Sequence, residues 1–536
     1  MLPHTLLLLT GVILTNSQTL NSLDEMYKVV ELKSVLSDQL DEYIHTVALN
    51  GKTKERLQKY ISKLHNESIS LAKEKLEEEM SHPVRVYRFF SELMTDLADI
   101  DKLIGEGTDE INDIMEQFPK DDELDLAADA IIRLQELYGD IADFTLPREN
   151  NSKDVLTANE LFDIGSRCMD NNNTCGALHY MLRAKELFEA ANDVDSLMMT
   201  LEHLVDLMEQ EGNFGYALNY TLLQIEYYES VGEQETVEVL KDSAEEYRYT
   251  LGGKLQAKKK ATLSEPYNCE PSPYFNFNYQ QLCKGETVIT EHTDKKPLHC
   301  HLYTNNNHPL LRLSPAKIEE INTAFGLSFA HDVLTEREIE LLKQAASSKF
   351  AASKIVEGRE DIDGSVIQQQ SRSSNTGWVF DEENKVIQEM SKRVATILNL
   401  DIESAEPFQV LSYGIGGFYL QHYDWDEDED SFPGFGGNRI ATWIFYLNDV
   451  KEGGATVFPH IGAAVWPEKG GAAFWRNLHY NGTPNDLNLH AACPVLKGYK
   501  WASNKWFHQH GNEFKWPCKL DSKLEFYMTE SFNSVE

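Results

Sequence analysis

Two histidines and one aspartate in the C-terminal part of the chain could together bind a metal ion. His422 and Asp424 are separated by one residue in the stretch 421–424. Side chains two positions apart in a strand lie on the same face, so both could reach one ion. The predicted third ligand is His490, 68 residues further along the chain. Two histidines and a carboxylate on one face of a ferrous ion leave positions open for a chelating cosubstrate and for dioxygen, so this set predicts oxygen activation.

A lysine close to the third ligand suggests how such a cosubstrate would be held. Lys500 follows His490 by ten residues. An ammonium at the inner end of a largely apolar barrel can pair with the far carboxylate of a dianionic ligand. On spacing alone, a solvated turn lysine is an equally open interpretation.

Six sequence blocks in a fixed order surround these residues. They are Tyr413-Gly414-Ile415-Gly416-Gly417, His422-Tyr423-Asp424, Asn438-Arg439-Ile440-Ala441-Thr442-Trp443, Gly453-Gly454-Ala455-Thr456-Val457-Phe458-Pro459, His490-Ala491-Ala492-Cys493-Pro494 and Lys500-Trp501-Ala502-Ser503-Asn504-Lys505-Trp506. Together they resemble the catalytic α subunits of animal collagen prolyl 4-hydroxylases, and the resemblance covers essentially the whole chain. It implies a double-stranded β-helix (jelly roll) that hydroxylates proline at C4 in collagen-like X-Pro-Gly peptides. The hydroxylation would be coupled to oxidative decarboxylation of 2-oxoglutarate to succinate and CO2.

The resemblance also implies roles for individual residues. His422, Asp424 and His490 would bind Fe(II), and Lys500 would hold the distal carboxylate of 2-oxoglutarate. Tyr413 would donate its hydroxyl to the same carboxylate, although on sequence alone a place in the barrel core is about equally open.

Three more residues receive roles in the same way. His508 would assist binding or decarboxylation of the cosubstrate, or contact the substrate. Arg439 and Trp506 would lie near the bound proline, with the indole offering an apolar face to the ring. L-Ascorbate would restore iron that is oxidised in unproductive turnovers.

The charge of the chain bears on its partners. The 536 residues include 49 basic and 87 acidic ones, a net charge of −38. A chain with this field would be repelled by phosphate, so we expect no nucleic-acid partner. The carboxylate run 424–430 is interpreted as a solvated loop in which only Asp424 is a ligand. If it rims the site, it would favour neutral or basic proline-rich peptides.

The beginning of the chain indicates entry into the secretory pathway. The apolar run Leu6–Leu14 is too short to span a bilayer, so residues 1–17 are interpreted as a cleaved signal peptide. No later stretch approaches about 18 apolar residues, and we expect no membrane span. Glycosylation sequons occur at Asn66, Asn150, Asn172, Asn219 and Asn481. We therefore expect a glycoprotein of the endoplasmic reticulum lumen.

The length predicts several domains in a multidomain α+β fold. Residues 18–145 read as helices whose apolar stripe (Val29, Leu32, Leu36, Leu40, Tyr43 and Val47) has helical spacing. An ordinary bundle and a coiled coil with a second chain both fit this stripe, and the resemblance favours dimerisation. Residues 154–250 contain a faint repeat, 176–180 and 216–220, typical of tetratricopeptide-like hairpins. In the resembled family such a domain takes up proline-rich peptide, but tyrosines at helical spacing are more often core, and segment 201–208 carries none.

The remaining domains follow in order. Residues 251–320 are interpreted as a linker and a disulfide-tied lead segment, 321–520 as the catalytic domain, and 521–536 as a tail. Thr335 is placed to cap a helix that packs against the barrel. Alternating apolar residues at 439–447 and 472–475 predict strands.

Seven cysteines in an oxidising compartment predict disulfides and one odd thiol. The resemblance points to Cys283 with Cys300 and to Cys493 with Cys518. A third pair, Cys168 with Cys175, is a guess that leaves Cys269 free.

The resemblance also supplies partners. Protein disulfide isomerase would act as the β subunit of an α2β2 tetramer with a second α chain, and procollagen would be the substrate. Two rival functions stay open: hydroxylation of a non-collagen secretory protein, and a noncatalytic paralogue that binds peptides or assembles subunits. The intact iron ligands and Lys500 argue against the second rival.

Overall fold

The computed structural model of this chain describes residues 18–71, 73–145, 152–252, 276–294, 298–323, 325–353, 372–427, 432 and 434–518. The chain divides into two compact units. The first runs up to Tyr138 and resumes at Pro273, and the second covers Gly139–Ser272. The predicted signal peptide, Cys269 and the predicted tail lie outside the described residues. Within those residues, every helix is too short or too polar to cross a bilayer.

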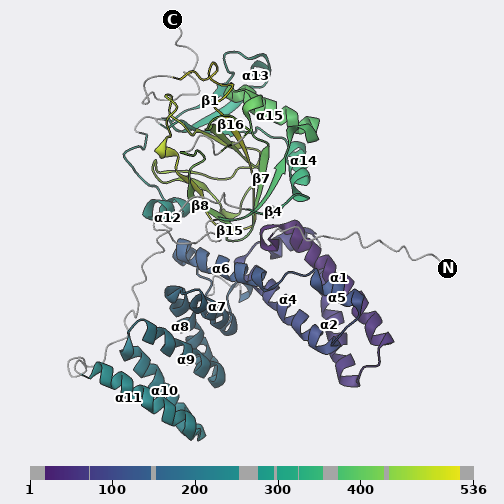
Figure 1. Cartoon of the computed structure of the whole chain (residues 1–536), viewed down its shortest axis with the longest axis vertical. Helices are drawn as coiled ribbons and strands as arrows, with labels where there is room; N and C mark the ends of the chain where they lie inside the picture. Colours follow the sequence, from purple (N-terminus) through teal and green to yellow (C-terminus); the bar gives the residue numbers. More distant parts are fainter. Residues whose placement is uncertain are drawn as a thin grey trace, which may run out of the picture. The chain divides into compact units, whose positions relative to one another are not determined.

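Helices fill the N-terminal part of the first unit, as the apolar spacing predicts (Figure 1). They are η1 (Thr19–Asn21), α1 (Leu23–Thr46), α2 (Gly51–Ser70), α3 (Lys73–Glu79), α4 (Pro83–Ile104), α5 (Asp109–Glu116) and α6 (Asp121–Tyr138). Val29, Leu36, Leu40 and Tyr43 of the predicted stripe are buried. Helix α1 packs against α2 and α5 of the same chain. Leu32 is half-buried and Val47 is exposed, so most but not all of this stripe packs within the chain.

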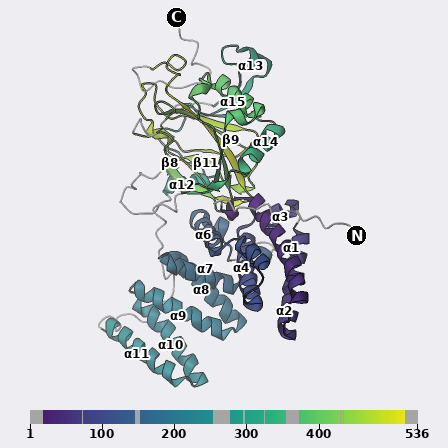
Figure 2. The same cartoon turned by 45° about the vertical axis from the view of Figure 1, so that its right-hand side comes forward.

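The second unit is a run of stacked helices, seen side by side in Figure 2. They are η2 (Gly139–Ala142), η3 (Ser152–Asp154), α7 (Ala158–Asp170), α8 (Thr174–Ala191), α9 (Val194–Gln210), α10 (Phe214–Val231) and α11 (Gln234–Leu251). Gly232 ends α10 with a φ of 84°, which allows a short turn into α11. The two repeated segments lie at the starts of α8 and α10. Of their three tyrosines, Tyr180 and Tyr220 are buried and Tyr216 is half-buried.

Strands dominate the first unit after Pro273. The elements are α12 (Phe277–Cys283), β1 (Cys300–Tyr303), α13 (Pro309–Leu313), β2 (Ala316–Asn322), β3 (Leu327–His331), α14 (Glu336–Ser347), β4 (Ala351–Ala352), β5 (Arg372–Ser373), β6 (Asn375–Val379), η5 (Asp381–Glu383), α15 (Lys385–Leu398), η6 (Ile402–Ser404), β7 (Phe408–Tyr413), β8 (Phe418–His422), β9 (Arg439–Tyr446), β10 (Glu452–Gly453), β11 (Thr456–Phe458), β12 (Ala463–Val465), β13 (Ala472–Arg476), η8 (Asp486–Asn488), β14 (His490–Ala492), β15 (Val495–Lys497) and β16 (Lys500–His508).

These strands form two main sheets and a short pair. In the described part of the chain, the larger sheet has the order β1-β2-β3-β13-β9-β16-β7-β6-β4, and the smaller has the order β12-β11-β14-β8-β5, while β10 pairs with β15. Neighbouring strands run antiparallel. Side chains of both sheets meet in one core, where Phe458 of β11 packs with Tyr446 of β9 and Trp475 of β13. This two-sheet arrangement agrees with the predicted jelly roll.

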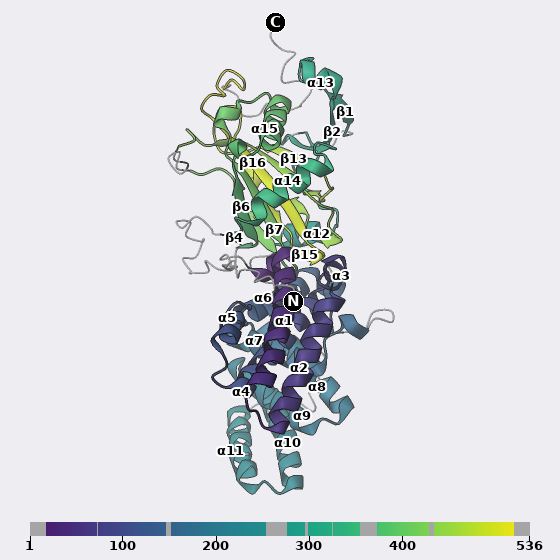
Figure 3. The ribbon, with the colours of Figure 1, turned by 90° about the vertical axis from the view of Figure 1, so that its right-hand side faces the viewer.

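Helices α14 and α15 cover the other face of the larger sheet (Figure 3). Leu342 of α14 and Val394 of α15 belong to the same buried cluster as Phe408 and Phe445 of the sheet. The predicted cap of α14 is confirmed, because the Thr335 hydroxyl accepts a hydrogen bond from the Glu338 N–H. Predicted strands 439–447 and 472–475 correspond to β9 and β13. The larger sheet already begins with β1 and β2, ahead of the predicted start of the catalytic domain at residue 321.

The disulfide pairing differs from the one that the resemblance implies. Cys283 is bonded to Cys493, with a Cα–Cα distance of 5.6 Å, so the predicted pairs Cys283–Cys300 and Cys493–Cys518 are both wrong. The reason is the position of α12, which ends at Cys283 and packs on β11, the neighbour of β14. Cys300 and Cys518 are exposed thiols. Cys168 is buried and is not bonded to Cys175, so the guessed third pair is also wrong.

Candidate functional site

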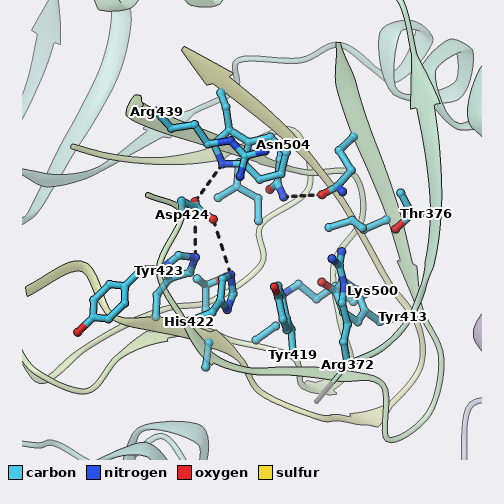
Figure 4. Close-up of a pocket in the computed structure, with 18 of the residues that line it drawn as sticks. Arg372, Thr376, Tyr413, Tyr419, His422, Tyr423, Asp424, Arg439, Lys500 and Asn504 are labelled. Carbon is cyan, nitrogen blue, oxygen red and sulfur yellow. Dashed lines mark hydrogen bonds and ion pairs between the residues drawn. The ribbon is translucent and has the colours of Figure 1, made fainter. Parts of the chain in front are cut away.

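A cavity of about 420 Å³ opens within the barrel, and residues of both sheets line it (Figure 4). The lining residues are Lys349, Ala351, Ala352, Arg372, Thr376, Trp378, Gln409, Leu411, Tyr413, Tyr419, His422, Tyr423, Asp424, Arg439, Ile444, Thr456, Trp475, His490, Ala491, Ala492, Lys500, Asn504 and Trp506. All of the predicted site residues except His508 are among them.

The three predicted metal ligands come together at one end of this cavity. Strand β14 pairs with β8 so that His490 lies directly opposite His422, which explains how residues far apart in sequence meet. Asp424 lies in the turn after β8, two residues beyond the strand end. The ligand atoms of the three side chains lie within 4.8 Å of one another. Each histidine Nε2 is 3.7 Å from a carboxylate oxygen of Asp424.

The backbone sets the tautomer of both histidines. The Nδ1 of His422 is 2.8 Å from the Leu420 carbonyl oxygen, and that of His490 is 2.8 Å from the Asn488 carbonyl oxygen. Carbonyls only accept, so each Nδ1 carries the proton and each Nε2 presents a lone pair. Burial and the neighbouring His490 hold the pKa of His422 well below its usual value, which keeps the ring neutral. Neutral imidazoles are the form that binds metal.

The carboxylate of Asp424 is fixed from behind by two donors. Its Oδ2 accepts hydrogen bonds from the Thr442 hydroxyl at 2.6 Å and from the Trp506 indole N–H at 3.0 Å. Burial alone would raise the pKa of Asp424, but the nearby histidines and Arg439 outweigh it and lower the pKa to about 2. Two imidazole lone pairs and an ionised carboxylate fit Fe(II), and the same donors would accept zinc, cobalt or copper.

Lys500 lies at the other end of the cavity, on β16 opposite Tyr413 of β7. Its side chain is fully buried, and no group in the described residues forms a hydrogen bond with its Nζ. Two aromatic rings lie near the Nζ, with the centroids of Tyr413 and Tyr446 at 5.5 and 5.7 Å. Burial lowers the pKa of Lys500 to about 7. A buried ammonium without a partner has the properties of an anion-binding group.

Arg372 is a second cation at this end, and the sequence analysis missed it. Its Nη2 is buried and forms no hydrogen bond within the described part of the chain. Its Nε donates to the Ser374 hydroxyl at 3.1 Å, and its guanidinium lies 4.5 Å from the ring centroid of Tyr419. Arg372 reaches the site because β5 pairs with β8. The spacing of residues in the sequence does not predict this pairing. Figure 4 shows Arg372, Lys500 and Tyr413 grouped together.

The residues predicted near the substrate separate into two layers. Arg439 and Trp506 line the cavity, with the guanidinium carbon 3.9 Å from the indole ring centroid. Arg439 also donates to the Glu406 carboxylate. His508 lies behind them, fully buried, with Nε2 2.8 Å from Glu406 and Nδ1 2.8 Å from the Gly437 carbonyl oxygen. The structure thus separates His508 from the cavity.

Of the carboxylate run 424–430, predicted to be a solvated loop, the structure describes residues 424–427. Asp424 is buried in the site, whereas Glu427 is exposed. Trp425 turns inward, where its indole N–H donates to Asn488 at 3.1 Å. Residues 428–431 lie outside the described residues.

Comparisons with known proteins agree with this site. Residues 408–508 match the sequence model of the 2OG-Fe(II) oxygenase superfamily, and residues 22–142 match that of the prolyl 4-hydroxylase alpha-subunit N-terminal region. Human prolyl 4-hydroxylase subunit alpha-1 is 31% identical over 97% of this chain and 99% of its own length. The chicken subunit alpha-1 is 32% identical (92% and 96% covered), and the Caenorhabditis elegans subunit alpha-1 is 27% identical (94% and 90% covered).

A solved viral collagen prolyl hydroxylase from Paramecium bursaria chlorella virus-1, complexed with 2OG, is 28% identical over 34% of this chain and 94% of its own. Its TM-score is 0.27.

The barrel and its site therefore define a dioxygenase that uses Fe(II) and 2-oxoglutarate. The chain belongs to the prolyl 4-hydroxylase alpha-subunit family, and the activity it carries is hydroxylation of proline.

Proposed function

We propose that this chain hydroxylates proline at C4 in collagen-like X-Pro-Gly peptides in the endoplasmic reticulum lumen, as a procollagen-proline 4-dioxygenase. The observation that carries the proposal is one cavity with a His-Asp-His set at one end and two buried cationic nitrogens at the other. Within the described residues, Lys500 Nζ and Arg372 Nη2 form no hydrogen bond. A dianion with a chelating head and a distal carboxylate matches both ends, and 2-oxoglutarate is such a molecule.

In this proposal His422, Asp424 and His490 hold the iron, which supplies oxygen activation when bound together with 2-oxoglutarate. Lys500 binds the distal carboxylate, and Arg372 adds a second charged donor there. Burial of these groups makes their pairing with an anion strong and selective.

The substrate proline would lie against Arg439 and Trp506. The indole offers the ring an apolar face, while Arg439 can donate to a peptide carbonyl. His508 and Glu406 would act indirectly, since they fix the Arg439 side chain rather than face the cavity.

We further propose that residues 154–250 form a tetratricopeptide-like domain that takes up the proline-rich chain. Helical hairpins of this kind stack into a concave surface, and aromatic rings on such a surface can receive a polyproline II ligand. Tyr227 and Tyr228 of α10 are half-buried, and their ring centroids lie 5.2 Å apart. They are better candidates for this contact than the buried Tyr180 and Tyr220.

The partners follow from the family. We propose that protein disulfide isomerase is the β subunit of an α2β2 tetramer and that residues 18–145 join two α chains. Because most of the stripe of α1 packs within the chain, that contact would mainly use another face. L-Ascorbate would keep the iron reduced.

The sequons at Asn66, Asn172 and Asn219 are exposed, as glycosylation in the lumen requires.

The test is a peptide panel analysed by mass spectrometry after incubation with Fe(II), 2-oxoglutarate and ascorbate. The enzyme is coexpressed with protein disulfide isomerase, and the panel contains Pro-Pro-Gly repeats, a basic proline-rich peptide and its acidic counterpart. We expect a mass gain of one oxygen on proline in the repeats, with matching succinate release. Hydroxylation of only the basic non-collagen peptide would indicate a non-collagen substrate, and no peptide-dependent succinate would indicate a noncatalytic paralogue.

A further inference from the structure

The first residues that the structure describes form a buried segment that has no role in the chemistry described so far. This N-terminal segment, residues 18–22, contains Thr19, Leu20, Asn21 and Ser22, all of which are buried. Three of these four side chains are polar, and polar groups are buried only where they have hydrogen-bond partners.

The partners of Asn21 belong to the wall of the barrel. Its Oδ1 accepts from the Gly414 N–H at 2.9 Å, and its carbonyl oxygen accepts from the Ser412 hydroxyl at 2.6 Å. Its Nδ2 donates to the Ser373 hydroxyl at 3.1 Å. One residue near the start of the described chain thus bonds two separate strand regions that lie more than 350 positions away.

Those bonds fall on the reverse side of the cavity wall. Leu411 and Tyr413 of β7 line the cavity, and Ser412 between them faces the opposite way, because alternate residues of a strand face opposite sides. In β5, Arg372 lines the cavity and its neighbour Ser373 faces the segment. The segment therefore lies behind the residues that form the 2-oxoglutarate end of the site.

The contact leaves no space at Gly414. A Cβ built on this glycine would lie 2.0 Å from the Leu20 carbonyl oxygen and 2.9 Å from the Asn21 Cα. Both are backbone atoms, so they cannot move aside as a flexible side chain could. Any larger residue at position 414 would push the segment off the wall.

The segment is also held at its other contacts. The carboxylate of Glu123 in α6 accepts the backbone N–H groups of Thr19 and Leu20 at 2.5 and 2.9 Å. Gln18 exchanges two hydrogen bonds with the Asn375 side chain, at 2.9 and 2.8 Å. The segment is thus fixed between α6 and the barrel.

We propose that the N-terminal segment is a positioning element for the cosubstrate end of the active site. By holding Ser412, Gly414 and Ser373 from behind, it sets the positions of Tyr413 and Arg372. It leaves the metal end alone, since none of its hydrogen bonds involves His422, Asp424 or His490. The inference rests on the proposed binding of 2-oxoglutarate at Lys500.

The test uses the full chain, coexpressed with its partner, in the variants Asn21→Ala, Ser412→Ala and Gly414→Ala. The KM for 2-oxoglutarate should rise about tenfold in each variant, because losing the buried hydrogen bonds lets the cavity wall shift and weakens cosubstrate binding. The kcat at saturating cosubstrate should change less than about twofold. Isothermal titration of 2-oxoglutarate into Mn(II)-loaded protein should show the same loss of affinity. Mn(II) affinity itself should stay at the wild-type value.

The matched control is Asn50→Ala. Asn50 caps α2 by accepting from the Thr53 N–H, on an exposed surface away from the barrel, so the same substitution there should leave the KM unchanged. Ser412→Ala removes one hydroxyl without adding volume. If the Gly414→Ala variant fails to fold, the KM of Ser412→Ala for 2-oxoglutarate still tests the inference.

Two results would overturn the inference: variants with wild-type affinity for 2-oxoglutarate, or variants in which kcat and Mn(II) affinity fall as much as the KM for 2-oxoglutarate rises. A wild-type enzyme that does not bind 2-oxoglutarate would instead refute the proposed function.

Discussion

The two ends of the cavity are built on opposite principles. At the metal end, protein groups already satisfy the ligands, because carbonyls hold both imidazoles and two donors hold Asp424. At the cosubstrate end, Lys500 and Arg372 each keep a buried nitrogen without a hydrogen bond in the residues that the structure describes. The protein's own groups fix the geometry of the metal end, whereas the cosubstrate end presents two buried nitrogens that are open to a ligand.

This difference indicates how each end should respond to mutation. Metal ligands held by the backbone lose function abruptly, since no other group can take their place. Mutation of the cations at the cosubstrate end should lower the affinity for 2-oxoglutarate in a graded way. A higher 2-oxoglutarate concentration should then restore much of the activity. Predictions about the two ends can therefore be separated by varying the 2-oxoglutarate concentration.

The largest expected effect is the removal of a metal ligand. His490→Ala should lower succinate formation more than about a hundredfold, because two donors hold the ion poorly and the third position opens to water. Raising 2-oxoglutarate should not restore activity. The measurement is peptide-dependent succinate release, with His510→Ala as the control on an exposed histidine of the same region. Retention of more than a few per cent of activity would remove His490 from the metal site.

Lys500→Ala should act on the other end. A buried charge-assisted pair contributes roughly 1.5–3 kcal/mol, so the KM for 2-oxoglutarate should rise about 10- to 150-fold. High cosubstrate should recover much of kcat, in contrast to His490→Ala. Lys497→Ala is the matched control, because that lysine is half-buried nearby and already pairs with Glu452. An unchanged KM in Lys500→Ala would contradict the proposed anion site.

The pH dependence of cosubstrate binding should report the same lysine. Burial lowers the pKa of Lys500 to about 7 in the free site, and only its protonated form pairs with a carboxylate. Above pH 7 binding must take up a proton, so the Kd of 2-oxoglutarate should rise about tenfold per pH unit, and below pH 7 it should be flat. Titration calorimetry of the Mn(II)-loaded protein measures this. In Lys500→Arg the Kd should not depend on pH over this range, and a slope retained there would assign the titration to another group.

The metal end could be predicted from sequence better than the cosubstrate end, for a physical reason. His422 and Asp424 are near neighbours in the chain, and ligand chemistry restricts the third residue to few types. The cap at Thr335 is equally local, and its prediction is confirmed. In both cases the prediction starts from residues only a few positions apart, and only His490 lies far away in the sequence.

Features that depend on how distant segments dock were missed or wrongly predicted. Arg372 enters the site through the pairing of β5 with β8. The Cys283–Cys493 bond depends on where α12 packs, and it joins residues 210 positions apart. His508 is chemically suited to an active site, but its alignment with Glu406 behind the wall is a matter of packing alone. Residue type and spacing do not carry this information.

The smallest expected effect tests whether the hydrogen bonds behind Asp424 matter. Thr442→Val keeps the shape of the side chain but removes the hydroxyl that donates to Asp424 at 2.6 Å. Losing such a supporting bond lowers metal affinity by about 10- to 100-fold in known sites. Here we expect metal affinity to fall about tenfold, because the Trp506 indole still donates to the same carboxylate oxygen.

The measurement is Fe(II) or Mn(II) affinity by anaerobic titration, together with the KM for 2-oxoglutarate, which should not change. Thr221→Val is the matched control, since its buried hydroxyl donates to the Ala217 carbonyl oxygen in α10 and Thr221 is not among the residues that line the cavity. If Thr442→Val changed the cosubstrate KM but not metal affinity, the two ends would not be independent, and the contrast between an imposed and a ligand-completed geometry would not hold.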